Sequence, residues 1–258
     1  MDGVLWQGET PMPGLVDFFE TIRANDIGFV LATNNARKTA VQYTEKLQRM
    51  GVTIPAHQIL TSAELSASIL SEMYPHGTAA YVIGDKGLHD AMRAKGFAII
   101  QPDDVKSGTG AALVIAGFTP YTDYKELAMG ALLVNRGAAF YGTNPDPTFP
   151  SELGPLPGAG ALFAFITAAT GVTPTTFGKP EPYVFEDAIK RLESSKENTA
   201  MVGDRLTTDI AGAKSAGLHT IMLLSGISTL DDVDQSDVKP DFIFSDLRAL
   251  TRELNGRV

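Results

Sequence analysis

The sequence predicts an α/β protein built around a parallel sheet, and two patterns indicate this. Short apolar runs that end in polar residues alternate with segments whose apolar residues recur at helical spacing. The run 200–202 predicts a buried strand that ends at Gly203 and Asp204. The run 28–32 predicts a second buried strand, which ends at Thr33. Helices between such strands are typical of a parallel sheet with crossover connections.

The same patterns predict the remaining elements along the chain. Predicted helices cover 15–25, 38–50, 62–74, 87–95, 124–136, 158–170, 183–192, 210–217 and 247–254. Further predicted strands cover 79–84, 97–101, 111–118, 139–142, 176–178, 220–224 and 241–244. Two segments are predicted as loops, because 145–158 holds five prolines and 231–237 is rich in aspartate.

The pattern of strand and helix restarts at Ala79, and this predicts two domains. The core domain would comprise residues 1–78 and 178–258, and residues 79–177 would form a smaller α/β domain inserted into it. A length of 258 residues allows one large domain or two modest ones.

The composition is that of a globular protein and argues against several classes. With 44% apolar and 20% charged residues, the chain is not of the disordered type. The absence of cysteine excludes thiol chemistry and fits a reducing cytoplasm. A net charge of −9 disfavours nucleic acid and anionic membranes as partners. Since neither a membrane span nor a signal-peptide pattern is visible, we expect a cytoplasmic protein.

Two carboxylates follow the strand predicted at 200–202, and they allow two interpretations. Asp204 lies at the end of the strand, and Asp209 lies five residues later, where a helix is predicted to begin. Carboxylates at such an edge suit a hard cation such as Mg²⁺. In the alternative interpretation, Asp204 belongs to a turn and Asp209 caps the helix. The stretch by itself leaves both interpretations open.

Four polar sites fall at strand ends of the predicted core. They are Asp2, Thr33 with Asn34, Lys179, and Asp204 with Asp209. Because the carboxyl ends of parallel strands share one edge of a sheet, the four sites should converge. Together they supply what phosphoryl transfer needs, namely a metal carboxylate, a cation, hydroxyl and amide donors, and a proton shuttle. Taken one by one, the same residues also fit a turn, a cap and a solvated lysine.

Motifs spread over nearly the whole chain resemble those of the haloacid dehalogenase (HAD) superfamily of phosphatases. The matching segments are 2–6, 33–35, 143–146, 157–160, 178–182 and 203–209. Within the superfamily, the chain is similar to the NagD-like, or p-nitrophenylphosphatase, branch, which carries a large α/β cap of type C2. The resemblance implies a Rossmann-like core, a cap at 79–177, Mg²⁺ as cofactor, and hydrolysis of small phosphorylated metabolites through an aspartyl-phosphate intermediate. It also implies a homodimer formed through the cap.

The resemblance implies a role for each motif residue. Asp2 would act as general acid and base, Thr33 would hold phosphoryl oxygens together with Asn34, and Lys179 would neutralise developing charge. The implied metal residues are Asp2, through its carbonyl, Asp204 and, beside them, Asp209. The implied substrate-binding residues are Gly3, Asn34, Asn35, Asn144, Asp146 and Phe149, of which the last three lie on a cap loop expected to set specificity.

The first motif departs from the family pattern. The family has Asp-x-Asp-Gly, with the first Asp as nucleophile, whereas here Met1 stands at x and Asp2 at the second Asp. Because 4–14 keeps the family pattern, we expect a truncated start rather than a natural loss, and little activity from this chain. The alternative is an inactive protein that binds a phosphate ligand without turnover. A smaller departure is Ala36, where relatives often carry Ser, and Trp6 is expected to serve local packing.

Overall fold

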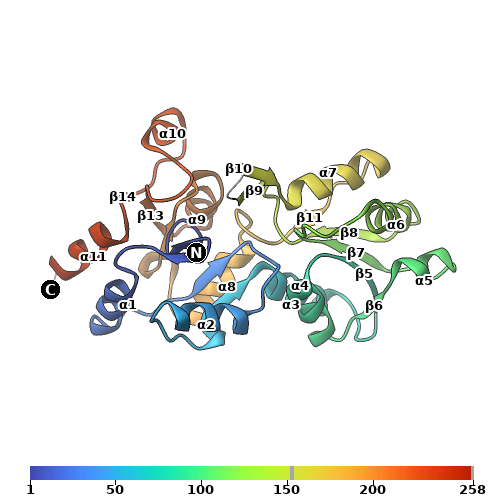
Figure 1. The fold of residues 1–258 in the computed structure, drawn as a ribbon, viewed down its shortest axis with the longest axis horizontal. Helices are drawn as coiled ribbons and strands as arrows, with labels where there is room; N and C mark the ends of the chain where they lie inside the picture. The colour runs from blue at the N-terminus through green and yellow to red at the C-terminus, as the bar shows by residue number, and fades with distance from the viewer. Residues whose placement is uncertain (152–153, 257–258) are drawn as a thin grey trace. The chain divides into compact units, whose positions relative to one another are not determined.

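The structure, a computed structural model, describes residues 1–151 and 154–256. The chain divides into two compact units (Figure 1). The first unit comprises Met1–Ala32, Val41–Ile59 and Lys179–Val258, and the second comprises Thr33–Ala40 and Leu60–Gly178. Both units combine parallel strands with helices, so the predicted α/β class is confirmed. The predicted domain limits at 78/79 and 177/178 stay predictions.

The second unit is built on a five-stranded parallel sheet with the strand order β11-β8-β7-β5-β6. Its strands are β5 (Ala79–Ile83), β6 (Ala98–Ile100), β7 (Leu113–Ala116), β8 (Ala139–Gly142) and β11 (Thr175–Thr176). Every neighbouring pair runs in parallel, so all carboxyl ends of these strands lie at one edge of the sheet. The residues that directly follow these strands therefore lie at that edge.

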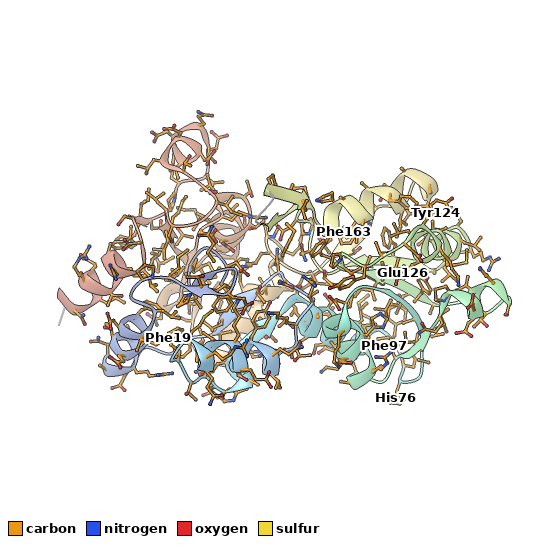
Figure 2. The ribbon with its side chains drawn as sticks, viewed as in Figure 1. Phe19, His76, Phe97, Tyr124, Glu126 and Phe163 are labelled. Carbon is orange, nitrogen blue, oxygen red and sulfur yellow. The ribbon has the colours of Figure 1, made fainter. Side chains whose placement is uncertain are left out.

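Helices cover both faces of this sheet. Ile83 belongs to a buried cluster with Phe163, and its neighbour Val82 belongs to a second cluster with Phe97. Figure 2 shows Phe163 and Phe97 on opposite sides of the sheet. Because successive strand residues point to opposite faces and both faces are buried, the strands appear in the sequence as continuous apolar runs.

Several helices of the second unit begin at residues whose side chains cap them. The helices of this unit are α3 (Ser62–Met73), α4 (Lys86–Ala94), α5 (Pro102–Lys106), α6 (Tyr124–Asn135) and α7 (Ala159–Thr170). The Thr61 hydroxyl accepts a hydrogen bond from the Glu64 N–H, and the Asp123 carboxylate accepts one from the Glu126 N–H. Such caps satisfy amides that have no partner within the helix. They explain why α3 and α6 begin where the sequence predicts them to begin.

The first unit contains a three-stranded parallel sheet with β12 at one end. Its strands are β12 (Ala200–Gly203), β13 (His219–Leu223) and β14 (Phe242–Phe244). Separate two-stranded sheets are formed by β1 (Trp6–Gln7) with β2 (Thr10–Pro11), and by β3 (Leu31–Thr33) with β4 (Ile59–Thr61), whose last residues pass into the second unit. The helices are α1 (Leu15–Ala24), α2 (Ala40–Arg49), α8 (Tyr183–Leu192), α9 (Ala211–Ala216), α10 (Leu230–Gln235) and α11 (Leu247–Gly256).

Two apolar runs that were predicted as buried strands are only partly buried. In β12, Met201 and Val202 are half-buried and Ala200 is exposed, and Phe29 and Val30 before β3 are also half-buried. Within the described residues, β12 pairs with β13 alone, and β3 lies in a sheet of only two strands. A strand with one neighbour keeps an open edge, which explains the residual exposure.

The segment 145–158, predicted as a loop, forms a β-hairpin instead. Strand β9 (Thr148–Ser151) pairs antiparallel with β10 (Gly154–Pro157). The predicted loop also included Glu152 and Leu153, which lie outside the described residues. Prolines are tolerated in a strand where the ladder needs no N–H donor.

The pairing register shows how the hairpin accommodates its prolines. Pro155 lies opposite Pro150. In an antiparallel ladder, pairs that exchange hydrogen bonds alternate with pairs that do not, so the N–H groups point towards the partner strand only at every second pair. The Gly158 N–H accordingly donates to the Pro147 carbonyl at 2.9 Å. Pro150, Pro155 and Pro157 therefore occupy positions at which no cross-strand donor is required.

The acidic segment 231–237, also predicted as a loop, is largely helix α10. The Thr229 hydroxyl accepts a hydrogen bond from the Asp232 N–H, and the Asp232 carboxylate accepts one from the Thr229 N–H. This capping box fixes the start of the helix, and Val233 anchors it because its side chain is buried. Within the residues that the structure describes, no helix is long and apolar enough to cross a membrane.

Candidate functional site

In the first unit, a buried ion pair lies at the carboxyl end of β12. The Lys179 Nζ lies 2.7 Å from Asp209 Oδ1, and both residues are about 5% exposed. The other oxygen of Asp209 accepts the backbone N–H groups of Asp204 at 3.3 Å and Arg205 at 3.2 Å. Asp209 is thus held by a cation and two amides, and it fixes the position of Lys179 beside the strand end.

Asp204 is enclosed by two backbone segments. Its Oδ2 accepts the Ile227 N–H at 3.0 Å. A Cβ atom on Gly226 would lie 2.0 Å from that oxygen, and a Cβ atom on Gly3 would lie 2.2 Å from it. Only glycine permits so close an approach of the backbone to the carboxylate. The turn that carries Asp2 and Gly3 is therefore held against Asp204, as the strand-end argument predicts for the core.

The two buried carboxylates differ in their pKa. Burial raises the pKa of Asp204, and the negative charge of Asp209 raises it further. Burial acts on Asp209 in the same direction, but the charge of Lys179 and the hydrogen bonds to Asp209 outweigh it, so the pKa of Asp209 is lowered. Asp209 is therefore the fixed counter-charge of Lys179, and Asp204 is the carboxylate that a further positive charge would stabilise.

Asp2 is exposed, and one buried side chain orients it. The indole Nε1 of Trp6 donates to Asp2 Oδ1 at 2.9 Å. Trp6 itself is fully buried, stacks on Tyr43 with ring centroids 6.0 Å apart, and carries the Lys46 Nζ 4.4 Å above its ring. Trp6 therefore does more than the local packing expected of it, because it holds the carboxylate that the sequence assigns to proton transfer.

The α-amino group of Met1 lies within electrostatic reach of the same cluster. Burial lowers the pKa of this amine, and the charge of Lys179 lowers it further, whereas Asp209 and Asp204 raise it. The charges of all three side chains therefore act at the position of the Met1 amine.

The donors around Asp204 fit a hard divalent cation that keeps part of its water. Asp204 Oδ1 accepts no hydrogen bond from the residues that the structure describes, whereas both oxygens of Asp209 are engaged. Over 1–151 and 154–256, no group of three His, Cys, Asp or Glu side chains is placed to hold a metal ion. Mg²⁺ commonly binds through one or two carboxylates and retains several waters. The arrangement thus fits Asp204 as a ligand and Asp209 as its neighbour.

In the second unit, five predicted site residues lie together. The Asn34 amide donates to Asp146 Oδ2 at 3.1 Å, and the Asn144 amide donates to the Asn34 carbonyl at 2.7 Å. The Asp146 N–H donates to Asn144 Oδ1 at 3.1 Å, and the Asn35 N–H donates to Thr33 Oγ1 at 3.1 Å. The loop after β3 and the loop after β8 are thus locked to each other within this unit.

Phe149 belongs to a neighbouring group that the sequence reasoning missed in part. Its ring stacks on Phe118 with centroids 4.7 Å apart, and the guanidinium carbon of Arg37 lies 5.8 Å from the Phe118 ring centroid. The Arg37 Nε donates to Asp85 Oδ2 at 2.9 Å. Asp85 follows β5, so applying the strand-end rule to the inserted domain as well as the core would have found it.

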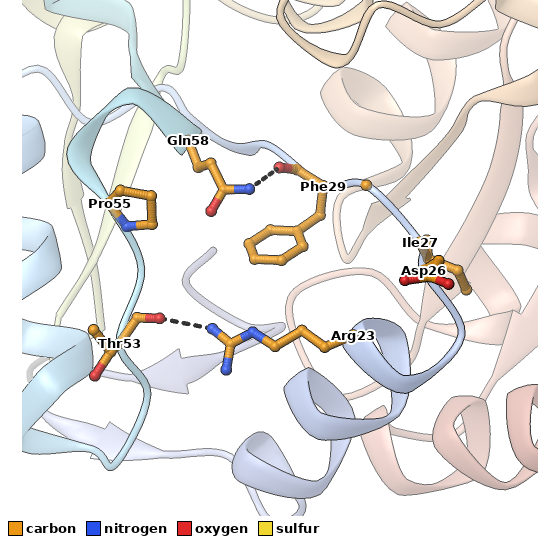
Figure 3. Close-up of a pocket in the computed structure, with 8 residues that line it drawn as sticks. Arg23, Asp26, Ile27, Phe29, Thr53, Pro55 and Gln58 are labelled. Atoms are coloured by element: carbon orange, nitrogen blue, oxygen red, sulfur yellow. Dashed lines mark hydrogen bonds between the residues drawn. The ribbon is translucent and has the colours of Figure 1, made fainter.

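A pocket of about 520 Å³ lies elsewhere in the first unit (Figure 3). Its polar groups already bind one another, because Arg23 donates to the Thr53 carbonyl at 2.6 Å and Gln58 donates to the Phe29 carbonyl at 3.4 Å. It contains none of the predicted site residues. We therefore place the candidate site at the strand ends and not in this pocket.

Comparison with known proteins identifies the family to which the chain belongs. Residues 1–98 match the family described as haloacid dehalogenase-like hydrolase, and residues 176–250 match one described as HAD-hydrolase-like. An acid sugar phosphatase of Staphylococcus aureus is 36% identical over 254 residues, which cover 98% of this chain and 95% of the relative. The two matched families are both families of hydrolases, and the fold is of the α/β class. The chain belongs to the haloacid dehalogenase-like hydrolase family.

Solved structures place the chain within the NagD-like phosphatases of that family. A 4-nitrophenylphosphatase from Thermotoga maritima is 33% identical with a TM-score of 0.90, covering 98% of this chain and 94% of that one. NagD from E. coli is 32% identical with a TM-score of 0.85, covering 96% and 94%. A glycerol phosphate phosphatase from Mycobacterium tuberculosis, crystallised in complex with magnesium, is 31% identical with a TM-score of 0.88, covering 98% and 76%. The predicted resemblance is confirmed.

Proposed function

We propose that this protein is a Mg²⁺-dependent phosphatase that hydrolyses small phosphorylated metabolites. The observation that carries the proposal is the buried Lys179–Asp209 ion pair beside Asp204, whose Oδ1 accepts no hydrogen bond from the described residues. A fixed cation next to a carboxylate of raised pKa suits a phosphoryl group and a divalent cation. Relatives named acid sugar phosphatase and glycerol phosphate phosphatase support a small phosphate monoester as substrate. Those names favour the enzyme over the inactive alternative.

Each residue of the site has a role in this proposal. Lys179 neutralises the charge that develops on the phosphoryl oxygens, and Asp209 keeps Lys179 in position. Asp2, oriented by Trp6, protonates the oxygen of the leaving group and afterwards accepts a proton from the attacking water. Asp204 would hold Mg²⁺, which when bound supplies positive charge to the phosphoryl oxygens.

The family resemblance also assigns roles to residues of the second unit. The Thr33 hydroxyl, which is buried, and the Asn34 amide donate hydrogen bonds to phosphoryl oxygens. Asn144 and Asp146 hold Asn34 in place. We further propose that residues 79–177 act as the cap of this enzyme. The aspartyl-phosphate intermediate requires a nucleophile at the position before Met1, by the family's Asp-x-Asp-Gly pattern. The homodimer and the cytoplasmic location stay predictions.

The function is tested by measuring phosphate release from a panel of small esters. We expect release to require Mg²⁺ and to disappear with a chelator. The panel should be run on residues 1–258 and on a version that carries an aspartate before Met1. No release from either version, with the fold intact by circular dichroism, would refute the proposed activity.

Replacing Asp204 tests the metal site. In the variant Asp204→Asn, we expect Mg²⁺ affinity to fall by at least about tenfold, because the remaining carboxylate, Asp209, is bound to Lys179; changes in supporting residues alone cost roughly 10–100-fold at metal sites. Asp209→Asn should weaken binding less. Isothermal titration calorimetry gives the affinities, and Asp231→Asn, an exposed aspartate of α10, is the matched control. An unchanged Mg²⁺ affinity in Asp204→Asn would show that Asp204 is not a ligand of the metal.

Replacing Phe149 tests the cap loop. Its ring stacks on Phe118 and belongs to a hairpin stiffened by prolines, so it presents apolar surface at little entropic cost. In Phe149→Ala, we expect the ranking of substrates by kcat/KM to change, by roughly 10-fold or more for the best ester. Phe165→Ala, on the surface of α7 in the same unit, is the control. Equal losses on every ester would argue against a role in specificity.

A further inference from the structure

Five side chains of the second unit form a group, here named the Arg37 cluster, of which only Phe149 has a role in the proposed function. Its members are Arg37, Asp85, Phe118, Tyr121 and Phe149. They come from the loop after β3, the end of β5, the segment after β7 and strand β9. All five belong to one unit, so the geometry among them is fixed by a single folded body.

Arg37 is held at its backbone as well as at its side chain. Its N–H donates to Asn35 Oδ1 at 2.9 Å, and its carbonyl accepts the Gly87 N–H at 2.9 Å. A Cβ atom on Gly87 would lie 2.6 Å from the Ala36 carbonyl oxygen, so this approach requires glycine. Arg37 is thus fixed in the same loop as Asn34, three residues further along the chain, and the proposed function assigns Asn34 to the phosphoryl group.

The guanidinium group of Arg37 has donors to spare. Only its Nε has a hydrogen-bond partner, Asp85, among the residues that the structure describes, and its side chain is 28% exposed. The two Nη groups are therefore oriented by Asp85 but can bind a ligand from solution. A guanidinium fixed in this way loses little side-chain entropy when it forms further hydrogen bonds.

Charge and shape indicate the chemistry of that ligand. Asp85 uses Oδ2 on Arg37 and Oδ1 on the Lys86 N–H, so it compensates the charge of Arg37. The rings of Phe118 and Tyr121 lie 5.8 and 6.0 Å from the guanidinium carbon, and Tyr121, which is 77% exposed, offers apolar surface to a ligand. Neutral oxygens attached to a carbon skeleton match this combination better than a second anion does, because a compensated cation attracts anions only weakly.

We propose that Arg37 is a specificity-determining residue that donates hydrogen bonds to hydroxyl oxygens of a sugar or polyol leaving group. Tyr121 lines the carbon face of that group, Phe118 packs against the Arg37 guanidinium, and Asp85 is the positioning residue for Arg37. The proposal rests on the proposed function, since it requires a phosphate ester as ligand. It differs from a merely structural Arg37–Asp85 ion pair, which would affect folding stability and leave selectivity unchanged.

The test measures binding, so it does not depend on turnover. Ligand-observed NMR titrations give Kd for three probes: glucose 6-phosphate, phosphoglycolate, which carries a carboxylate, and ethyl phosphate, which carries neither group. We expect Arg37→Ala to weaken glucose 6-phosphate relative to ethyl phosphate by about tenfold or more, the scale of a lost hydrogen bond to a charged group. Arg136→Ala, an exposed arginine at the end of α6, should leave that ratio unchanged.

Two further variants separate the effect of the paired Nη donors of Arg37 from the effect of its charge. Arg37→Lys keeps the charge but not the paired Nη donors, so it should also lose selectivity for glucose 6-phosphate. Asp85→Asn keeps an acceptor for the Lys86 N–H but removes the compensating charge, so it should shift binding several-fold towards phosphoglycolate.

The outcomes distinguish this inference from the proposed function. If Arg37→Ala loses the preference for glucose 6-phosphate over ethyl phosphate while its thermal unfolding is unchanged, the inference is supported even if no ester is hydrolysed. An unchanged ratio in both Arg37→Ala and Arg37→Lys would overturn it, even if the protein is an active phosphatase. Wild-type protein that prefers phosphoglycolate to glucose 6-phosphate would also overturn it.

Discussion

An aspartate placed immediately before Met1, at the end of an added apolar strand, should raise hydrolysis of 4-nitrophenyl phosphate at least about a thousandfold over residues 1–258, on the scale of nucleophile deletions in other enzymes. The charges of Lys179 and Asp204 both act on the α-amino group of Met1, so we expect the added residue to lie in the same electrostatic environment. Asp2 is poorly suited to replace it, because Trp6 holds the Asp2 carboxylate in place for proton transfer.

The control for this experiment is the same added strand ending in asparagine. It restores the strand without the carboxylate, so it should stay near the rate of residues 1–258. Steady-state kinetics at saturating Mg²⁺ compare the three proteins. Comparable rates for residues 1–258 and for the version ending in aspartate would contradict the prediction, and would mean that another group or an activated water attacks phosphorus.

Removal of the Lys179 ammonium should have the second large effect, on stability. In Lys179→Met, the free energy of unfolding should fall by about 3–5 kcal/mol, because Asp209 is left as an uncompensated buried charge. Lys214→Met, which breaks a pair with Asp241 at about a third exposure, should cost no more than about 1 kcal/mol. Urea titration followed by circular dichroism measures both variants, and equal losses would contradict the prediction.

The stabilisation that the Lys179–Asp209 pair provides should depend on pH. Because the folded protein lowers the pKa of Asp209, ionised Asp209 stabilises the fold above its ordinary pKa of 3.8. That stabilisation is lost as the pH falls through the lowered value of the folded state. The gap in unfolding free energy between wild type and Lys179→Met should therefore be full at pH 7 and narrow below about pH 4. A gap that does not change with pH would show that the lost stability comes from packing.

Sequence reasoning located the helices best where amphipathic spacing and a cap act together. Helices α1, α3 and α8 begin at the predicted residues, and α3 has the Thr61 cap to fix its start. The loop prediction for α10 is wrong because it rests on the density of negative charge alone. The spacing of Thr229 and Asp232 in the sequence is that of a capping box, which indicates the start of a helix. The β9–β10 hairpin was missed because tolerance for proline depends on the pairing register, which involves residues on two strands.

The candidate site was predictable in its members but not in its pairings. Strand ends identified Asp204, Asp209 and Lys179, yet nothing in their spacing shows that Asp209 gives one oxygen to Lys179 and the other to backbone amides. The contact between Asn34 and Asp146 joins residues far apart in the sequence. Such contacts depend on how the loops fold over one another, and a single sequence carries no signal for that.

The open edge of β12 has a consequence for how the protein could be assembled from pieces. Within the described residues, β12 pairs with β13 on one side only, and its apolar residues Met201 and Val202 are half-buried. An edge of this kind presents unpaired backbone groups to any extended segment that can add to the sheet. A separate peptide with an apolar strand ending in aspartate is therefore expected to add to this edge as a further parallel strand, so the open edge of β12 is a place where fragment complementation can be tested.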